Sequence, residues 1–171
     1  MSLDESRIED VPQLTADEND ILTAPFTKKE VFEAIAQMKN NKAPGPDGFP
    51  VEFYKKCWHF IKGDLMPMFH EFFIGQLYLF KLNFGTITLL PKKTEAIRIE
   101  QFRPIRLLNV SFKIFTKVGT NRLTQIAHSV VQPSQTAYMP DRNILEGVVV
   151  LHESLHEIHS KKLDGVIFKV D

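Results

Sequence analysis

Residues 44–48 constrain the fold of this 171-residue chain more than any other segment. They read PGPDG, so two prolines and two glycines occupy five successive positions. Proline has no backbone N–H and glycine disfavours helix, so no helix can pass through the segment and a defined turn is required. The chain must therefore build separate helices before and after it. We assign the turn a structural role, a rigid reversal between two helices.

Helices are predicted on both sides of this turn. Before it, Thr27 and Glu30 have the spacing of a capping box. The apolar residues that follow at helical spacing are Val31, Ile35 and Met38. After it, Pro50 suits the first turn of a second helix. That helix carries Phe53, Tyr54, Trp58 and Ile61, and a third helical stretch covers about 65–73. Residues 1–22 are acidic and lack a period, which predicts a tail or linker ahead of one partial domain at 23–171.

The middle of the chain has a different character. Residues 85–93 and 101–110 are rich in strand-forming residues and are joined by a charged connection, which predicts a β-hairpin with a long basic arm. Residues 81–122 hold nine basic and two acidic side chains, although the net charge of the whole chain is zero. A basic middle favours an anionic partner such as nucleic acid. A solvated basic face explains the charge equally well.

Two long helices are predicted after the hairpin. The first covers about 111–131, and the residues along one side of it are Phe115, Val118, Arg122 and Ile126. The second covers about 143–160, and its apolar stripe is Ile144, Val148, Leu151, Leu155 and Ile158. A short strand at 165–171 then ends on Asp171, whose side chain alternates with the apolar face of that strand. The predicted fold class is α+β.

Composition limits the cellular setting. The one cysteine, Cys57, cannot form an intramolecular disulfide and suits a reducing compartment. The acidic N-terminus lacks the pattern of a secretory signal, and the most apolar stretch, residues 72–80, is too short to cross a bilayer. These features predict an intracellular protein of the cytoplasm or nucleus with no membrane partner.

The blocks of this sequence, taken in order, resemble the front half of reverse transcriptases from LINE-type (non-LTR) retrotransposons. The residues that carry the resemblance are NKAPGPDGFPVEFYK, ITLLPKK, FRPIRLLNVSFKIFTKVGTNRL, QTAYMPDRNILEGVVVLHESLHEIHSKK and GVIFKVD. It covers about residues 24–171. It implies part of a right-hand polymerase fold, with a helical leader, the fingers β-hairpin, two long helices and the first palm strand.

The resemblance also implies an activity, RNA-directed DNA synthesis by nucleotidyl transfer. Its partners would be an RNA template, a DNA primer, nucleoside triphosphates and the remainder of the palm and thumb. Polymerases hold two Mg²⁺ ions with carboxylates on a rigid support. The resemblance gives this catalytic and metal-binding role to Asp171. Without the resemblance, a solvated C-terminal aspartate is the simpler interpretation.

Cationic side chains are needed for the triphosphate, and arginine makes forked contacts with phosphate. The resemblance places nucleotide binding on Arg103, with Lys92 on the facing strand as a second candidate. A surface ion pair between Arg103 and Glu100 is the alternative. The candidate contacts to template or primer phosphate are Arg106, Lys113, Lys117 and Arg122, each of which could equally be solvated or paired.

The chain contains no Asp-Asp pair, with which the resembling family completes its metal site. One carboxylate cannot hold two Mg²⁺ ions in catalytic geometry. We therefore expect a truncated reverse transcriptase domain that does not polymerise alone. A non-catalytic nucleic-acid-binding remnant is the alternative interpretation.

A rival motif lies in the last predicted helix. His152, Glu153 and His156 match the H-E-x-x-H pattern of zinc hydrolases, and His159 lies one turn further on. Catalytic zinc sites usually take a third protein ligand. The extension of the motif that would supply one is absent, because EIHSKK has neither the Gly nor the His at the required position. Zinc-dependent hydrolysis is therefore the weaker hypothesis.

Overall fold

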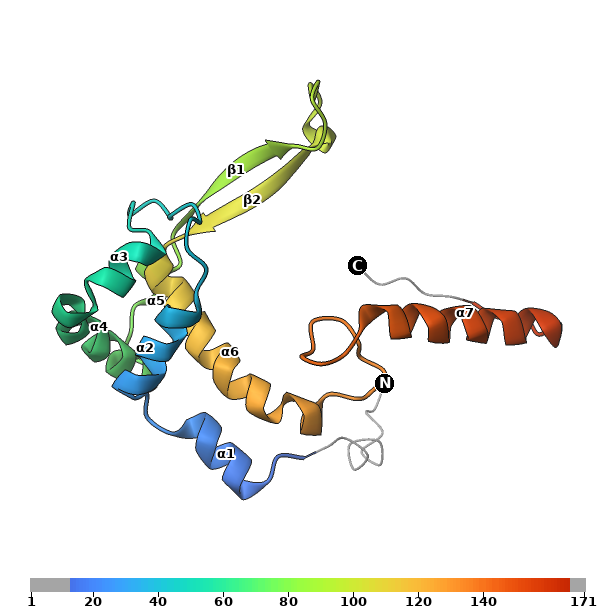
Figure 1. Ribbon diagram of the computed structural model, residues 1–171, viewed down its shortest axis with the longest axis horizontal. Coiled ribbons are helices and arrows are strands. Elements are labelled where there is room, and N and C mark those ends of the chain that lie inside the picture. Colours follow the sequence, from blue (N-terminus) through green and yellow to red (C-terminus); the bar gives the residue numbers. More distant parts are fainter. Residues whose placement is uncertain (1–12, 167–171) are drawn as a thin grey trace, which may run out of the picture. The chain divides into compact units, whose positions relative to one another are not determined.

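The computed structural model describes residues 13–166, which form an α+β arrangement of helices and one two-stranded sheet (Figure 1). The helices are α1 (Ala16–Thr23), α2 (Lys28–Gln37), α3 (Val51–Lys56), α4 (Trp58–Phe73), α5 (Leu79–Leu82), α6 (Val110–Val130) and α7 (Ile144–Ser160). The strands are β1 (Gly85–Pro91) and β2 (Phe102–Leu108), with a 3-10 turn, η2 (Ile99–Gln101), between them. Within the described range, no helix combines the length and apolar character needed to cross a membrane.

The chain divides into two compact units. The larger unit is Asn19–Leu123, and the other contains the described residues 13–18 and 124–166. The predicted hairpin and the two long helices are confirmed, with bounds that differ from the prediction by three residues or fewer. Most of the first palm strand predicted at 165–171 lies in residues 167–171, outside the described part of the chain, and the described residues 165 and 166 are not in a strand.

Two local features differ from the sequence prediction. The last residues of the expected polar tail at 1–22 belong to α1, which ends at Thr23 and buries no residue. This helix is held by its own cap, because the Thr15 N–H donates to Glu18 Oε2 (2.9 Å) and the Glu18 N–H donates to Thr15 Oγ1 (3.2 Å). The second difference is where the next helices divide. The break lies at Cys57, between α3 and α4, and α4 continues through Gly63 and Pro67 to Phe73.

The core of the larger unit lies where α2, α3, α4 and α6 meet. Its centre is a stacked pair of rings, Phe69 and Phe115, with centroids 4.0 Å apart and planes inclined at 18°. Phe69 is fully buried, and so are the side chains of Val31, Ile35, Val110, Ile114 and Val118. The capping box predicted at Thr27 and Glu30 is confirmed, and it fixes the start of α2 beside this core.

Arg122 of α6 is the only charged residue that is buried among residues 13–166, and 6% of its surface is exposed. Its Nε donates to Glu30 Oε1 (2.7 Å) and its Nη2 donates to Glu30 Oε2 (3.1 Å). Nη1 donates to the carbonyls of Leu22 (3.1 Å) and Ala24 (2.6 Å), and Nη2 also donates to that of Pro25 (3.0 Å). All five guanidinium N–H groups are therefore used.

This arrangement differs from the exposed phosphate contact that the sequence suggested for Arg122. The guanidinium carbon also lies 4.4 Å from the ring centroid of Phe26, which covers one face of the group. With no donor left and almost no exposed surface, Arg122 cannot contact nucleic acid from this position. Its role is to tie α6 to the segment that leads into α2.

Helix α7 contrasts with α6, because none of its residues is buried. Its predicted apolar stripe is present, but Ile144 and Val148 are 61% and 55% exposed. The α6 residues Phe115, Val118 and Ile126 are all buried, as their spacing predicted. Spacing therefore identified the apolar side of both helices and did not determine whether that side is covered.

We predict that Arg122→Met destabilises the larger unit by about 3 kcal/mol, because it leaves three carbonyls and the Glu30 carboxylate without their partner. Urea unfolding followed by Trp58 fluorescence measures this, since Trp58 is the only tryptophan and lies in this core. The matched control is Lys29→Met, which removes the exposed i,i+4 ion pair with Glu33 on α2. It should change stability by less than about 0.5 kcal/mol.

The same variant should change the acid dependence of stability. The Arg122 hydrogen bonds, together with those from Thr27, lower the pKa of Glu30 from 4.5 to about 2. A depressed folded-state pKa contributes stability that is fully present above pH 4.5 and is lost as the pH falls towards about 2. Arg122→Met should reduce the loss of stability across this window. Equal acid sensitivity of the two proteins would contradict the assignment.

Candidate nucleic-acid interface

The hairpin register decides which of its basic side chains share a face. Strands β1 and β2 are antiparallel, and Leu90 pairs with Arg103 while Ile87 pairs with Arg106. A main-chain bond from the Lys92 N–H to the Gln101 carbonyl (2.8 Å) continues this register by one pair. Because side chains alternate along a strand, Lys92 and Arg103 lie on one face of the hairpin and Arg106 lies on the other.

Lys92 and Arg103 are both exposed on that shared face. As diagonal neighbours, their Cβ atoms are separated by about 7–8 Å or less. The Lys92 Nζ donates to the Glu100 carbonyl (2.7 Å), which holds the side chain near the end of the strands. Within the described residues, Arg103 has no ion pair. Glu100, its expected alternative partner, pairs instead with Arg98, with 3.5 Å between Nε and Oε2.

The other basic candidates lie elsewhere. Arg106 donates from Nη2 to the Asn83 carbonyl (2.7 Å), on the opposite hairpin face. Lys113 and Lys117 are half-buried and lie one turn apart on α6. Of the six basic side chains singled out from the sequence, the structure therefore brings Lys92 and Arg103 together on one face and places Arg122 in the interior.

The turn at residues 44–48 docks where β2 ends and α6 begins. The Asp47 N–H donates to the side-chain oxygen of Asn109 (3.2 Å), and the Gly48 N–H donates to the Gly45 carbonyl (3.0 Å). Gly48 has φ +75°, a conformation that glycine adopts readily. A Cβ atom on Gly45 would lie 2.5 Å from the carbonyl carbon of Leu108 and would overlap the Asn109 main chain. The absent side chain at Gly45 is what allows this contact.

The sequence did not predict this contact, which lies at the base of the candidate interface. The turn was identified, but Asn109 was not, because its partner lies 62 positions away in the chain. Asn109 follows directly on β2, and its carbonyl accepts the Lys113 N–H in the first turn of α6 (3.2 Å). The turn therefore fixes the base of the hairpin that carries Lys92 and Arg103.

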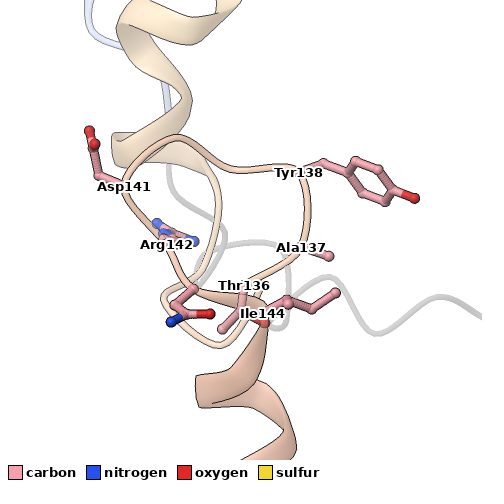
Figure 2. A pocket seen from close by; sticks show the side chains of 7 residues that line it. Thr136, Ala137, Tyr138, Asp141, Arg142 and Ile144 are labelled. Carbon is pink, nitrogen blue, oxygen red and sulfur yellow. The ribbon is translucent and has the colours of Figure 1, made fainter.

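The loop before α7 lines an open pocket of about 530 Å³ (Figure 2). Arg142 points into the loop and donates to the carbonyls of Val131, Gln132 and Gln135 at 2.6–3.0 Å. Tyr138 points outward and has φ +62°. No pattern in the sequence indicated Arg142, whose hydrogen bonds to these three carbonyls hold the loop together. The lining residues are Thr136, Ala137, Tyr138, Asp141, Arg142, Asn143 and Ile144.

Comparison with known proteins gives two relatives. The chain is 31% identical over 147 residues to the "Transposon TX1 uncharacterized 149 kDa protein" of Xenopus laevis, a match that covers 85% of this chain and 11% of that protein. It is also 28% identical over 112 residues to the "Retrovirus-related Pol polyprotein from type-1 retrotransposable element R1" of Bradysia coprophila, covering 64% of this chain and 11% of that protein. These similarities support a protein derived from a non-LTR retrotransposon. No protein-family model matches the chain.

The chain spans about a tenth of the length of the relatives it matches. The match to the Pol polyprotein supports an origin related to reverse transcriptase. Asp171, the predicted catalytic and metal-binding residue, lies outside the described residues. Among residues 13–166, no group of three or more His, Cys, Asp or Glu side chains could hold a metal ion.

The positions of the histidines on α7 bear on the zinc hypothesis. His152, Glu153, His156 and His159 all lie on α7 and are exposed. No described His, Cys, Asp or Glu side chain joins this row to complete a metal-binding group. The structure therefore gives no observation in favour of zinc-dependent hydrolysis.

We predict that Gly45→Ala destabilises the larger unit by about 2 kcal/mol, because the added methyl group displaces the turn from Asn109. The matched control is Gly63→Ala in α4, where a Cβ meets nothing within 4 Å. That change should stabilise the unit by about 0.5–1 kcal/mol through helix propensity. Urea unfolding monitored by Trp58 fluorescence measures whether each variant lowers or raises the free energy of unfolding. A neutral Gly45→Ala would show that the turn is not seated on Asn109.

Proposed function

We propose that this chain is the nucleotide- and template-handling part of an RNA-directed DNA polymerase, comprising its fingers and the start of its palm. The observation that carries the proposal is the register that puts Lys92 and Arg103 on one exposed hairpin face. Two cations at this separation can contact one triphosphate, arginine by a forked pair of N–H donors and lysine as a point charge.

Arg103 is the stronger of the two nucleotide contacts. Its guanidinium has no ion-pair partner among the described residues, so its donors remain available for phosphate. Lys92 already donates to a carbonyl at the end of the hairpin, which restricts where its ammonium group can reach. Arg106, Lys113 and Lys117 are the proposed contacts to template or primer phosphate, which would position the strand without reading its sequence.

The catalytic metal ions belong to a part of the site that the described residues do not contain. In the proposed polymerase, Asp171 would supply one carboxylate for Mg²⁺, and carboxylates from another segment would be needed beside it. The 171-residue chain has no Asp-Asp pair that could supply them. We therefore propose that this polypeptide alone binds phosphate-bearing partners and does not polymerise.

We predict that the chain binds single-stranded RNA with an affinity that falls as salt rises, because binding releases counterions from phosphate. Arg103→Ala and Lys113→Ala should each weaken binding and reduce the logarithmic salt slope by about 0.7. Fluorescence anisotropy of a labelled RNA oligonucleotide at several salt concentrations measures both quantities. The control is Lys29→Ala on α2, whose side chain is 84% exposed and lies outside the proposed face. A Lys29→Ala effect equal to that of Arg103→Ala would contradict a localised surface.

We predict no nucleotide incorporation by this chain in primer extension on an RNA template with Mg²⁺, because a single carboxylate cannot complete the two-metal site. The measurement is gel analysis of extended primer over a long incubation at high protein concentration. Asp171→Ala is the control for contaminating polymerase. Extension by the chain that disappears in Asp171→Ala would overturn the proposed inactivity.

A further inference from the structure

The larger unit contains a small pocket whose chemistry is opposite to that of the basic hairpin. It has a volume of about 190 Å³ and lies between α3, α4 and the start of α6. Its wall is mostly aromatic and aliphatic, with one carboxylate and no cationic side chain. The lining residues are Phe49, Phe53, Tyr54, Ile61, Asp64, Leu65, Met68 and Ser111.

The charge of this pocket selects against phosphate. Asp64 is exposed in the pocket wall, and its carboxylate has no ion pair or hydrogen bond within residues 13–166. Burial raises the pKa of the Tyr54 hydroxyl, and the negative charge of Asp47 raises it further, so a second carboxylate acts on the same wall. A ligand that carried negative charge would be repelled here, whereas a cation would gain a partner.

The aromatic rings are arranged for a cationic group. The Phe49 and Phe53 rings lie 4.7 Å apart at 35°, and Phe53 and Tyr54 lie 5.5 Å apart at 89°. Phe49 keeps 46% exposure although it is a large apolar residue. The turn at 44–48 fixes its position, because the Phe49 N–H donates to Asp47 Oδ1 (3.1 Å). In a pocket wall that holds both aromatic rings and a carboxylate, the ring quadrupole and the negative charge both attract a cation.

The size of the pocket limits its occupant. Sites for small molecules and cofactors usually enclose about 300–1,000 Å³, so this pocket is too small for a nucleoside triphosphate. Its volume suits a single long side chain entering from the surface. A planar guanidinium both stacks on ring faces and donates a fork of N–H groups to a carboxylate, which an ammonium cannot do.

We propose that this pocket binds the side chain of an arginine from a partner protein segment, with its guanidinium against the rings of Phe49 and Phe53 and its N–H groups donated to Asp64. The partner is therefore a basic, arginine-bearing peptide segment. The site is separate from the hairpin face that carries Lys92 and Arg103, and it does not depend on polymerase activity.

The test uses the full 171-residue chain with ¹³C-labelled methionine methyl groups and the peptide acetyl-Gly-Arg-Gly-amide. Binding should shift the resonance of Met68, which lines the pocket, and this resonance is assigned with Met68→Leu. The same peptide with citrulline in place of arginine keeps the shape and loses the charge. We expect citrulline to bind about tenfold more weakly or worse, since it loses the cation–π and charge-assisted contacts.

Variants locate the effect. Asp64→Asn should reduce binding of the arginine peptide to the level of the citrulline peptide, and Asp20→Asn, at an exposed carboxylate of α1, should leave it unchanged. Phe49→Leu should also weaken binding, and unchanged urea unfolding by Trp58 fluorescence shows that each variant is folded. Equal binding of arginine and citrulline, tighter binding of a lysine peptide, absence of a Met68 shift, or an unaffected Asp64→Asn would each overturn the proposal.

Discussion

The larger unit depends on one guanidinium. Arg122 joins α6 to the end of α1, to the connecting segment and to α2 through five hydrogen bonds that use every donor it has. Glu30 serves two purposes at once, since its carboxylate accepts from Thr27 in the capping box and from Arg122 across the unit. The start of α2 and the flank of α6 are therefore fixed by the same group. The core packs between these two helices, so its geometry depends on this pair.

A second long-range contact positions the candidate surface on the hairpin. The turn at 44–48 rests on Asn109, where β2 passes into α6. No residue of β1 or β2 is buried, and most of their residues are exposed. A two-stranded ribbon with little burial is not positioned by its own packing. Its direction is set instead at its base, by the turn that seats against Asn109 and by α6.

The parts of this fold that were predictable from sequence are those that depend on neighbours in the chain. The capping box at Thr27 and Glu30, the prolines and glycines at 44–48 and the strand-forming runs on either side of the charged connection are local signals, and each one is found in the structure. Helix α1 was missed because it has no apolar period and buries no residue. The register of the hairpin could not be predicted, because a long connection leaves the pairing undetermined.

For Arg122, helical spacing and positive charge pointed to different locations. It occupies a position in the same α6 stripe as Phe115, Val118 and Ile126, all of which are buried. Its positive charge suggested a phosphate contact, whereas its spacing indicated the interior, and the spacing was decisive. Burial of an arginine requires a partner for every donor. Those partners come from residues about 90–100 positions earlier in the chain, which no local pattern reveals.

The two proposed binding surfaces of the larger unit select partners of opposite charge. The hairpin face presents Lys92 and Arg103, whereas the small pocket presents Asp64 among aromatic rings and has no cation in its wall. The turn at 44–48 contributes to both, because Asn109 receives it at the base of the hairpin and Asp47 fixes Phe49 in the pocket wall. A change in the seating of this turn would therefore be felt by both surfaces. The segment that first constrains the fold also links the two surfaces structurally.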